Sequence, residues 1–267
     1  MDLSFWLLCA AALLISAIGF YKYVYFISLG YGFSIAGLGL LMLYLFGRND
    51  LLTPGTVAAC VLFFLYGVRL GGFLLIRELK SAAYNTKMKT EIKDGSKIGF
   101  GVKCAIWITC AALYVLQVLP VYFRLFNGAG TDGFCIAGAC VMLFGVLFES
   151  AADWQKNALK KKNPNRFCDT GLFRIVRCPN YLGEVIFWTG VLISGINILS
   201  GALQWALALT GYIGIVFVMF SGARRLELRQ NRNYGKDPEY QKYVRTVPIL
   251  LPFIPLYSVE KYKWLVA

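Results

Sequence analysis

Three small groups of polar residues stand within or beside apolar stretches of the chain, where ionisable side chains are costly and usually serve a function. The first group is Tyr66 and Arg69, in the stretch Phe64-Leu-Tyr-Gly-Val-Arg-Leu. A spacing of three places both residues on one helix face, and a cation beside a phenol makes the phenol a better proton donor. The alternative is an arginine that snorkels to the membrane surface beside an interfacial tyrosine.

The second group closes an apolar run in the stretch Phe148-Glu-Ser-Ala-Ala-Asp-Trp-Gln-Lys. Glu149 and Asp153 are four residues apart, so they share a helix face. Two carboxylates there repel each other unless hydrogen-bond donors or cations lie nearby. The pattern indicates either a binding site for such groups or a helix that leaves the membrane and becomes polar.

The third group surrounds the predicted start of a helix. Asn180 and Glu184 share a face one turn inside the membrane boundary, and Gly183 leaves backbone room for a ligand. Arg174 and Arg177 precede them, and helix N-termini with neighbouring arginines bind anions. The helix dipole accounts for an acid at this position, but not for the whole set. The pattern favours a binding site.

The elements that must position these groups are membrane-spanning helices. Of the 267 residues, 58% are hydrophobic and 15% are charged, against about a quarter in soluble domains. Apolar runs of about 20 residues match the thickness of a bilayer. We expect an all-α polytopic membrane protein that forms one transmembrane domain over residues 1–267. The seven predicted spans are Leu3–Tyr21, Val24–Phe46, Thr53–Ile76, Cys104–Phe123, Gly133–Phe148, Tyr181–Leu199 and Leu203–Met219.

The basic residues predict the orientation of these spans. Seven Lys and Arg residues lie in each of the segments 77–103, 156–177 and 224–245. These segments follow the third, fifth and seventh spans, so all three fall on one side of the membrane. The positive-inside rule puts that side in the cytoplasm. We expect an outside N-terminus and a cytoplasmic C-terminus, in a bacterial inner membrane or the endoplasmic reticulum.

Metal and nucleic-acid sites are not expected. The chain has no histidine, and its eight cysteines show no paired ligand spacing. The formal net charge of +13 sits on loops beside the spans. Membrane lipids, rather than nucleic acid, are therefore the expected charged partners, together with an anionic cofactor.

Beyond these residue patterns, the chain resembles the membrane reductases that share the steroid 5-alpha-reductase C-terminal domain, and in particular the DUF1295 branch. The resemblance runs from about Tyr66 to Pro255. It is specific because several motifs occur in order. They are Glu149-Ser-Ala-Ala-Asp-Trp-Gln-Lys, Asp169-Thr-Gly-Leu-Phe-Arg, Pro179-Asn-Tyr-Leu-Gly-Glu and Glu239-Tyr-x-x-Tyr-x-x-x-x-Pro-x-x-x-Pro.

The resemblance implies seven transmembrane helices, with cytoplasmic loops that close a cavity for NADPH. It implies that Tyr66 donates a proton and that Arg69 meets the cofactor. It also implies that Asn180 and Glu184, with Tyr181 between them, contact the nicotinamide end. The remaining implied cofactor-binding residues, near the ribose and phosphates or matched more loosely, are Glu149, Asp153, Arg174, Arg224 and Arg225.

Two positions depart from the family pattern. Cys178 stands where the group usually has His before the Pro-Asn pair, and the second span, Val24–Phe46, lacks the Gln-Glu pair that helps the steroid enzymes polarise a ketone. The resemblance implies an NADPH-dependent reductase of a carbon–carbon double bond in a steroid-, sterol- or prenoid-like lipophilic substrate. Two alternatives stay open. One is an S-adenosylmethionine-dependent methyltransferase of the isoprenylcysteine carboxyl methyltransferase type, and the other is a non-enzymatic lipid-binding or transport protein.

Overall fold

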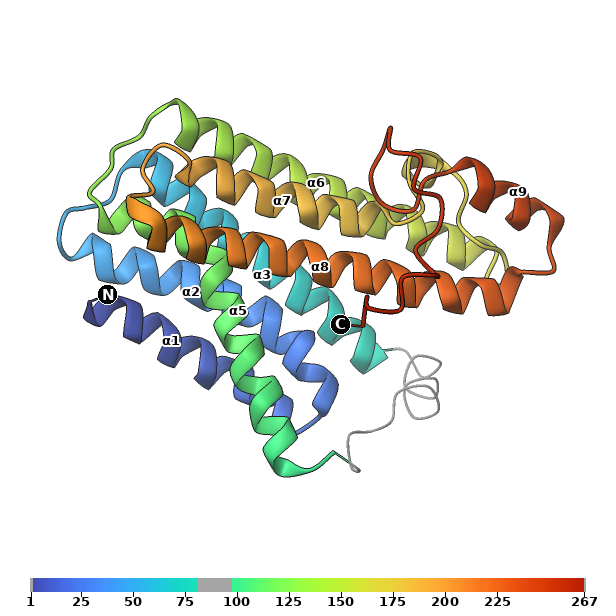
Figure 1. Cartoon of the computed structure of the whole chain (residues 1–267), viewed down its shortest axis with the longest axis horizontal. Coiled ribbons are helices and arrows are strands. Elements are labelled where there is room, and N and C mark those ends of the chain that lie inside the picture. Colours follow the sequence, from blue (N-terminus) through green and yellow to red (C-terminus); the bar gives the residue numbers. More distant parts are fainter. Residues whose placement is uncertain (1, 81–97, 267) are drawn as a thin grey trace. The chain divides into compact units, whose positions relative to one another are not determined.

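The computed structural model describes residues 2–80 and 98–266, and every regular element within those ranges is a helix (Figure 1). The predicted all-α class is therefore confirmed. Short 3-10 turns lie between some of the longer helices. In chain order the elements are α1 Leu3–Ser16, η1 Ala17–Phe20, η2 Tyr23–Ile27, α2 Leu29–Gly47, α3 Pro54–Lys80, α5 Phe100–Phe126, α6 Gly133–Lys162, η3 Gly171–Arg174, α7 Pro179–Gly195, α8 Gly201–Tyr234 and α9 Pro238–Thr246.

Six helical stretches in the described residues are long and apolar enough to cross a membrane, which indicates an integral membrane protein. The predicted sixth span forms α7, but α7 has only 17 residues. At 1.5 Å per residue it reaches about 25 Å, short of a hydrocarbon core of about 30 Å. The predicted count of seven is thus not exact. The six stretches are Leu3–Phe20, Tyr23–Gly47, Pro54–Ile76, Phe100–Phe126, Gly133–Lys162 and Gly201–Tyr234.

The chain folds into two compact units. The first comprises Met1–Ala139 and Val191–Gly211, and the second comprises Cys140–Gly190 and Tyr212–Ala267. Tyr66 and Arg69 belong to the first unit. The other predicted site residues belong to the second.

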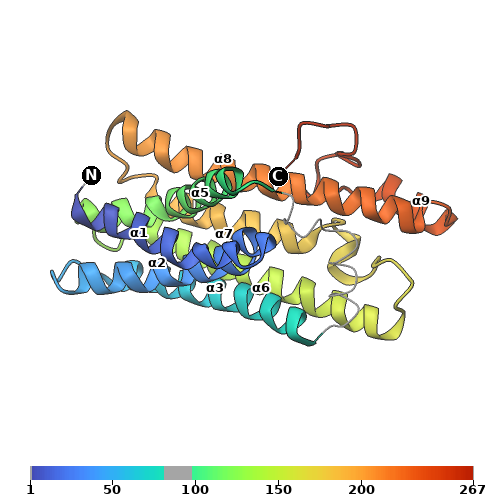
Figure 2. The same cartoon turned by 90° about the horizontal axis from the view of Figure 1, so that it is seen from below.

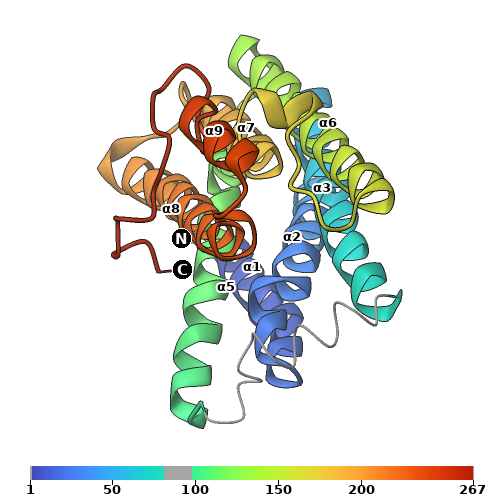
Figure 3. The same cartoon turned by 90° about the vertical axis from the view of Figure 1, so that its right-hand side faces the viewer.

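In the first unit, α2 and α3 touch through glycine. A Cβ atom on Gly32 would lie 2.9 Å from the Gly67 carbonyl oxygen and 2.7 Å from the Gly71 nitrogen, closer than real Cβ atoms come to other atoms. Only hydrogen fits there, so the two backbones lie in direct contact, and Figure 3 shows the helices side by side. This close approach sets which α2 side chains face α3.

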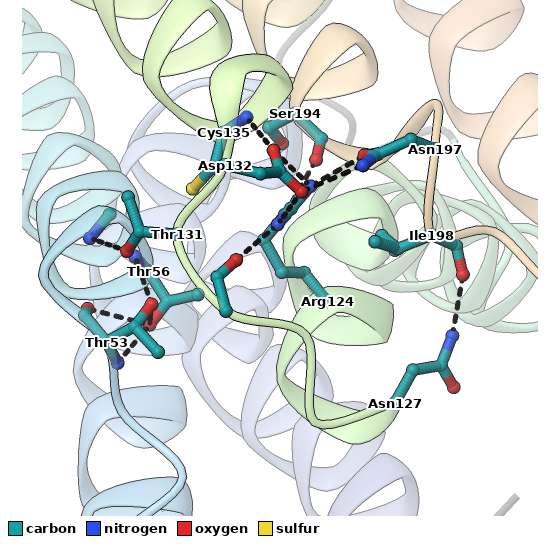
Figure 4. A network of polar contacts seen from close by, with 12 residues as sticks. Thr53, Thr56, Arg124, Asn127, Thr131, Asp132, Cys135, Ser194, Asn197 and Ile198 are labelled. Carbon is teal, nitrogen blue, oxygen red and sulfur yellow. Dashed lines mark hydrogen bonds and ion pairs between the residues drawn. The ribbon is translucent and has the colours of Figure 1, made fainter.

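A buried arginine joins the α5–α6 connection to the end of α7 and to the α7–α8 connection (Figure 4). Arg124 of α5 is fully buried, and its guanidinium donates to Asp132 at 2.9 and 3.2 Å, to the Ser194 carbonyl at 2.8 Å and to Asn197 at 2.8 Å. Asp132 also accepts the Cys135 amide at 2.8 Å and so caps α6. A buried charge with this many partners is a structural anchor. The sequence patterns gave no hint of it.

In the second unit, α6 and α8 continue well beyond their apolar parts. The corresponding predicted spans end at Phe148 and Met219, whereas the helices end at Lys162 and Tyr234. The basic stretch after the seventh span is therefore mostly a continuation of α8, and not a separate helix on the membrane surface. Lys160 of α6 donates to the Tyr234 hydroxyl at 2.9 Å, so two of the three basic segments lie at the same end of this unit.

The C-terminal part of the second unit folds back on its own helices. Figure 2 shows α9 beside the end of α8, where Phe167, Tyr240 and Tyr243 form an aromatic cluster. The segment after α9 turns back on itself at Pro252 and Phe253, and the Ile249 amide donates to the Leu256 carbonyl at 2.9 Å. Its Pro248 and Ile249 carbonyls accept the amides of Arg177 and Cys178 at 2.9 and 3.0 Å. The tail therefore fixes the residues that precede α7.

Candidate functional site

The start of α7 brings Asn180 and Glu184 onto one helix face, as predicted. The helix begins at Pro179, and the Glu184 side chain is buried. The Oδ1 atom of Asn180 is also buried and has no hydrogen-bond partner among residues 2–80 and 98–266. Buried polar atoms in folded proteins are nearly always paired. An amide left in this state is consistent with a place for a hydrogen-bonding ligand.

Glu149 of α6 lies against the same turn of α7. A Cβ atom on Gly183 would lie 2.7 Å from both the Cβ and the nitrogen of Glu149. The space beside Gly183 is therefore filled by α6, and our expectation that it leaves room for a ligand is wrong at this position. Instead, the glycine lets the helices approach until the buried Glu149 stands beside the turn that carries Glu184.

Tyr181 joins α7 to α8. A Cβ atom on Gly222 of α8 would lie 3.3 Å from the Tyr181 ring, so the hydroxyl end of the ring packs against that helix. The charged side chains that act electrostatically on the Tyr181 hydroxyl include Glu184 of α7 and Arg225 and Arg229 of α8. The basic face of α8 thus meets the polar face of α7.

The polar extension of α6 is the third helix that contributes charged residues to this group. Lys156 lies within electrostatic range of Asp153, of Cys178 at the start of α7 and of Arg229 on α8. Lys156 and Arg229 were not predicted as site residues. For Lys156 a signal existed, because Glu149, Asp153 and Lys156 are spaced four and three residues apart and so share one helix face.

The predicted phosphate-binding arginines have different surroundings. Arg224 donates from Nε to the Glu260 carbonyl at 3.0 Å, so its guanidinium is already held by the C-terminal segment. Arg225 is exposed, and both residues line a pocket of about 280 Å³. Arg174 is exposed at the end of η3. The remaining residues of the pocket are Ser221, Leu228, Arg232, Leu265 and Val266.

Arg177, which the sequence suggested as an anion ligand together with Arg174, instead forms a buried ion pair. Its Nη2 lies 2.7 Å from Oε1 of Glu227 on α8, with side chains 0% and 3% exposed. The other Glu227 oxygen accepts the Val259 amide at 2.9 Å, and Arg177 also donates to the Tyr257 carbonyl. This pair joins the start of α7, α8 and the tail. The pair therefore helps to hold in place the start of α7, which carries Asn180 and Glu184.

Cys178, in the position where the family usually has His, is fully buried just before α7. Burial raises the pKa of its thiol to about 12, more than the nearby positive charges of Arg177 and Lys156 lower it. A neutral thiol is a poor nucleophile and a poor proton acceptor. Cys178 is therefore a packing residue of this site.

In the first unit, Tyr66 is fully buried and Arg69 is partly exposed one turn further along α3. The Tyr66 hydroxyl lies 2.9 Å from the hydroxyl of Tyr31 on α2. Tyr31 was not predicted as a site residue, because a tyrosine near the start of an apolar span is common at membrane interfaces.

The described residues hold no group of three or more His, Cys, Asp or Glu side chains that could bind a metal ion. The site is instead a set of carboxylates, amides, hydroxyls and cations. In the second unit it gathers residues from α6, α7 and α8. Such a set can bind a polar ligand that carries both hydrogen-bond donors and negative charge.

Comparisons with known proteins agree with these features. A family model described as "Protein of unknown function (DUF1295)" matches residues 20–247. A protein named steroid 5-alpha-reductase DET2, from Gossypium hirsutum, is 25% identical over 122 residues, which are 45% of this chain and 42% of the relative. The match thus spans less than half of that relative's length. No solved structure matches. Because the family model covers most of the chain, from the first 3-10 turn to the end of α9, this protein belongs to the DUF1295 family.

Proposed function

We propose that the protein is a membrane-embedded reductase that uses NADPH to reduce a carbon–carbon double bond in a steroid-, sterol- or prenoid-like substrate. Membership of the DUF1295 family and similarity to a protein named as a steroid 5-alpha-reductase support this proposal. The observation that carries it is the buried Oδ1 of Asn180, which lacks a hydrogen-bond partner in the described part of the chain. This atom lies on the helix face that also presents Glu184.

The acceptors around the start of α7 fit the nicotinamide end of the cofactor. The Asn180 oxygen can accept an N–H of the nicotinamide carboxamide, and the Glu184 and Glu149 carboxylates can accept further N–H or ribose O–H groups. The Tyr181 hydroxyl adds a group that both donates and accepts. Hydrogen bonds of this kind fix the orientation of the ring, which hydride transfer requires.

Cations around the same group fit the phosphates. Lys156 and Arg229 add positive charge beside Asp153, whose carboxylate can accept ribose hydroxyls. Arg225 adds a third cation near Tyr181. We also assign Arg224 and Arg174 to the phosphate end. For Arg224 this requires the guanidinium to exchange its bond to the Glu260 carbonyl for one to the ligand.

Bound NADPH would supply the hydride, and Tyr66 would supply the proton. In an electron-poor alkene the negative charge that follows hydride addition develops on a conjugated carbonyl oxygen. A phenol that donates a hydrogen bond to that oxygen stabilises the charge, and such donors contribute about 10² to 10⁴ in rate. Arg69, one turn along α3, would make Tyr66 a better donor and meet the cofactor.

The basic ends of α6 and α8 support an orientation in which the second unit's polar end faces the cytoplasm, where NADPH is available. The N-terminus would then lie outside and the C-terminus inside. We propose that both units serve one activity and so act as a single transmembrane domain. Substrate would reach the protein from the lipid phase, because its solubility in water is low.

A titration with NADPH in detergent tests the cofactor assignment, with the intrinsic fluorescence of the six tryptophans as readout. Asn180→Ala removes the unpaired acceptor, and we expect binding to weaken about tenfold, which equals about 1.4 kcal/mol. Glu184→Gln added to this change weakens binding further. Asn157→Ala is the matched control, because Asn157 is an exposed asparagine on α6. Its affinity should equal that of the wild type.

Two results would overturn the assignment. One is the absence of NADPH binding to the wild type, and the other is undiminished binding to the Asn180→Ala, Glu184→Gln variant. Tighter binding of S-adenosylmethionine than of NADPH would instead favour the methyltransferase alternative. Binding of neither ligand would favour a lipid-binding or transport protein.

A further inference from the structure

Two buried hydroxyls from neighbouring helices share a hydrogen bond in the first unit. The Oη atoms of Tyr31 on α2 and Tyr66 on α3 are 2.9 Å apart, and the side chains are 7% and 0% exposed. Their rings meet edge to face, with centroids 6.2 Å apart at 73°. Each phenol has one proton, so one of the two donates in this bond and the other accepts.

The fold holds this pair in place at the backbone. Gly32 and Gly67 directly follow the two tyrosines, and these glycines are where α2 and α3 touch. A Cβ atom on Gly32 would lie 2.9 Å from the Gly67 carbonyl, so the two backbones pack in direct contact beside the tyrosines. The separation of the hydroxyls is therefore fixed by helix packing and not by flexible side chains.

A third tyrosine fixes the other side of Tyr31. The Tyr31 ring packs against Tyr114 of α5, with centroids 5.2 Å apart at 32°. The Tyr114 hydroxyl donates to the Phe26 carbonyl at 2.5 Å. The Tyr114 proton is thus committed to the backbone. Tyr31 is held between Tyr114 and Tyr66, with its own hydroxyl directed at Tyr66.

The direction of the bond matters for a proton donor. If Tyr31 donates to Tyr66, the Tyr66 proton is not used in this bond and can be given to a substrate oxygen. When Tyr66 gives up that proton, the electron pair of its O–H bond stays on its oxygen as a phenolate. A hydrogen bond donated to a charged oxygen is about twice as strong as one to a neutral oxygen, and a low dielectric strengthens it further.

We infer that Tyr31 is a positioning residue for Tyr66: it donates to the Tyr66 oxygen, turns the Tyr66 proton outward and stabilises the phenolate that forms. This inference rests on the proposed role of Tyr66. The hydride from the cofactor and the proton that Tyr66 gives to the carbonyl oxygen convert the enone to an enol, and the enol becomes the saturated ketone when its α-carbon takes a proton from water and its oxygen releases one. Tyr66 then regains a proton from water. Tyr31 itself does not touch the substrate.

The test compares two hydroxyl deletions of equal size, Tyr31→Phe and Tyr114→Phe. Oxidation of NADPH is followed with two enone probes, progesterone and a prenyl enone, in detergent micelles. In Tyr31→Phe we expect kcat to fall at least tenfold with KM within about twofold, and the solvent deuterium isotope effect on kcat to rise, because proton donation becomes slower. In Tyr114→Phe the same parameters stay within about twofold, since its hydroxyl bonds the Phe26 carbonyl and the Cys110 thiol, outside the bond between Tyr31 and Tyr66.

A double-variant cycle separates this inference from the proposed function. Tyr66→Phe should lose most activity, and adding Tyr31→Phe should cause no further loss, because Tyr31 acts through Tyr66. Unchanged kcat in Tyr31→Phe, or additive losses in the double variant, would overturn the positioning role while Tyr66 keeps its own. Full activity of Tyr66→Phe, or no enone-dependent NADPH oxidation by the wild type with either probe, would overturn the proposed function and this inference with it.

Discussion

Arg177 and Glu227 form an ion pair of 2.7 Å in which both side chains are shielded from solvent. The pair links Arg177, just before α7, to the C-terminal part of α8, and Glu227 also accepts the amide of Val259. A pair of this kind holds the start of α7 in position while the polar residues of that helix face the candidate site. Its loss should therefore affect the fold first and the site through the fold.

Glu227→Gln keeps the size of the side chain but leaves Arg177 buried with no counter-charge. Breaking a buried pair in this way costs about 3–5 kcal/mol, so we expect a large drop in the melting temperature in detergent. Glu239→Gln is the matched control, because Glu239 pairs with Arg166 at the surface at 2.8 Å. Its melting temperature should stay close to that of the wild type. Equal stability of the two variants would contradict the anchoring role of Glu227.

Gly183→Ala should separate α6 from α7. Its new methyl group would lie 2.7 Å from Glu149 backbone and Cβ atoms that cannot rotate away. Overpacking typically costs about 1–3 kcal/mol, and we expect both the melting temperature and the NADPH affinity to fall.

Gly72→Ala in α3 provides the contrast for that change. A Cβ atom there meets nothing within 4 Å, so alanine should stabilise the helix by about 0.5–1 kcal/mol. The role of Gly183 as a helix contact is wrong if Gly183→Ala is as stable as Gly72→Ala.

Stability should fall in acid because of Asp132. Burial alone raises the pKa of this carboxyl, but hydrogen bonds from Asn197, the Cys135 amide and Arg124 outweigh burial and hold the pKa well below its ordinary value of 3.8. A lowered folded-state pKa stabilises the fold above the unfolded value, and this contribution is lost as the pH falls through the folded value.

The measurement for Asp132 is the melting temperature of wild type and Asp132→Asn between neutral pH and about pH 3. We expect the wild type to lose more stability than the variant as the pH falls below 3.8, the ordinary value of the group. Parallel curves for the two proteins would show that Asp132 is not charged and paired in the folded state.

Cys178 should resist thiol reagents in the folded protein. Because burial raises its pKa to about 12, the thiolate is scarce at pH 8, and the residue is shielded from solvent. A variant that retains only Cys178 should react with a maleimide after denaturation and stay unlabelled before it. Rapid labelling of the native protein would place this cysteine at an accessible surface.

The sequence predicted the helices well because apolar runs of bilayer length have few alternative structures. It misjudged where α6 and α8 end. The hydrogen bond between Lys160 and Tyr234, near these two ends, joins residues 74 positions apart, and a local sequence pattern does not reveal such a contact. For the same reason it gave no sign that Arg124 anchors the α5–α6 and α7–α8 connections of the first unit. Such contacts depend on tertiary structure and leave no periodic pattern.

The candidate site was predicted in part. Asn180 and Glu184 share a face because their spacing of four dictates it once a helix forms. Gly183 was misread, because a ligand and a neighbouring helix both require a residue without a side chain, and spacing does not distinguish them. Tyr31 was missed because its importance comes from its hydrogen bond to Tyr66, which lies on a different helix.

The most direct test of the proposed reductase activity is the transfer of hydrogen to product. The purified protein is incubated with the two enone probes and NADPH that carries deuterium at the hydride-donating carbon of its nicotinamide. Mass spectrometry should find a saturated product with one deuterium from the cofactor, and a second hydrogen that exchanges with the isotope of the solvent. Recovery of unchanged enone from both probes, or a saturated product with no deuterium from the cofactor, would contradict the proposed function.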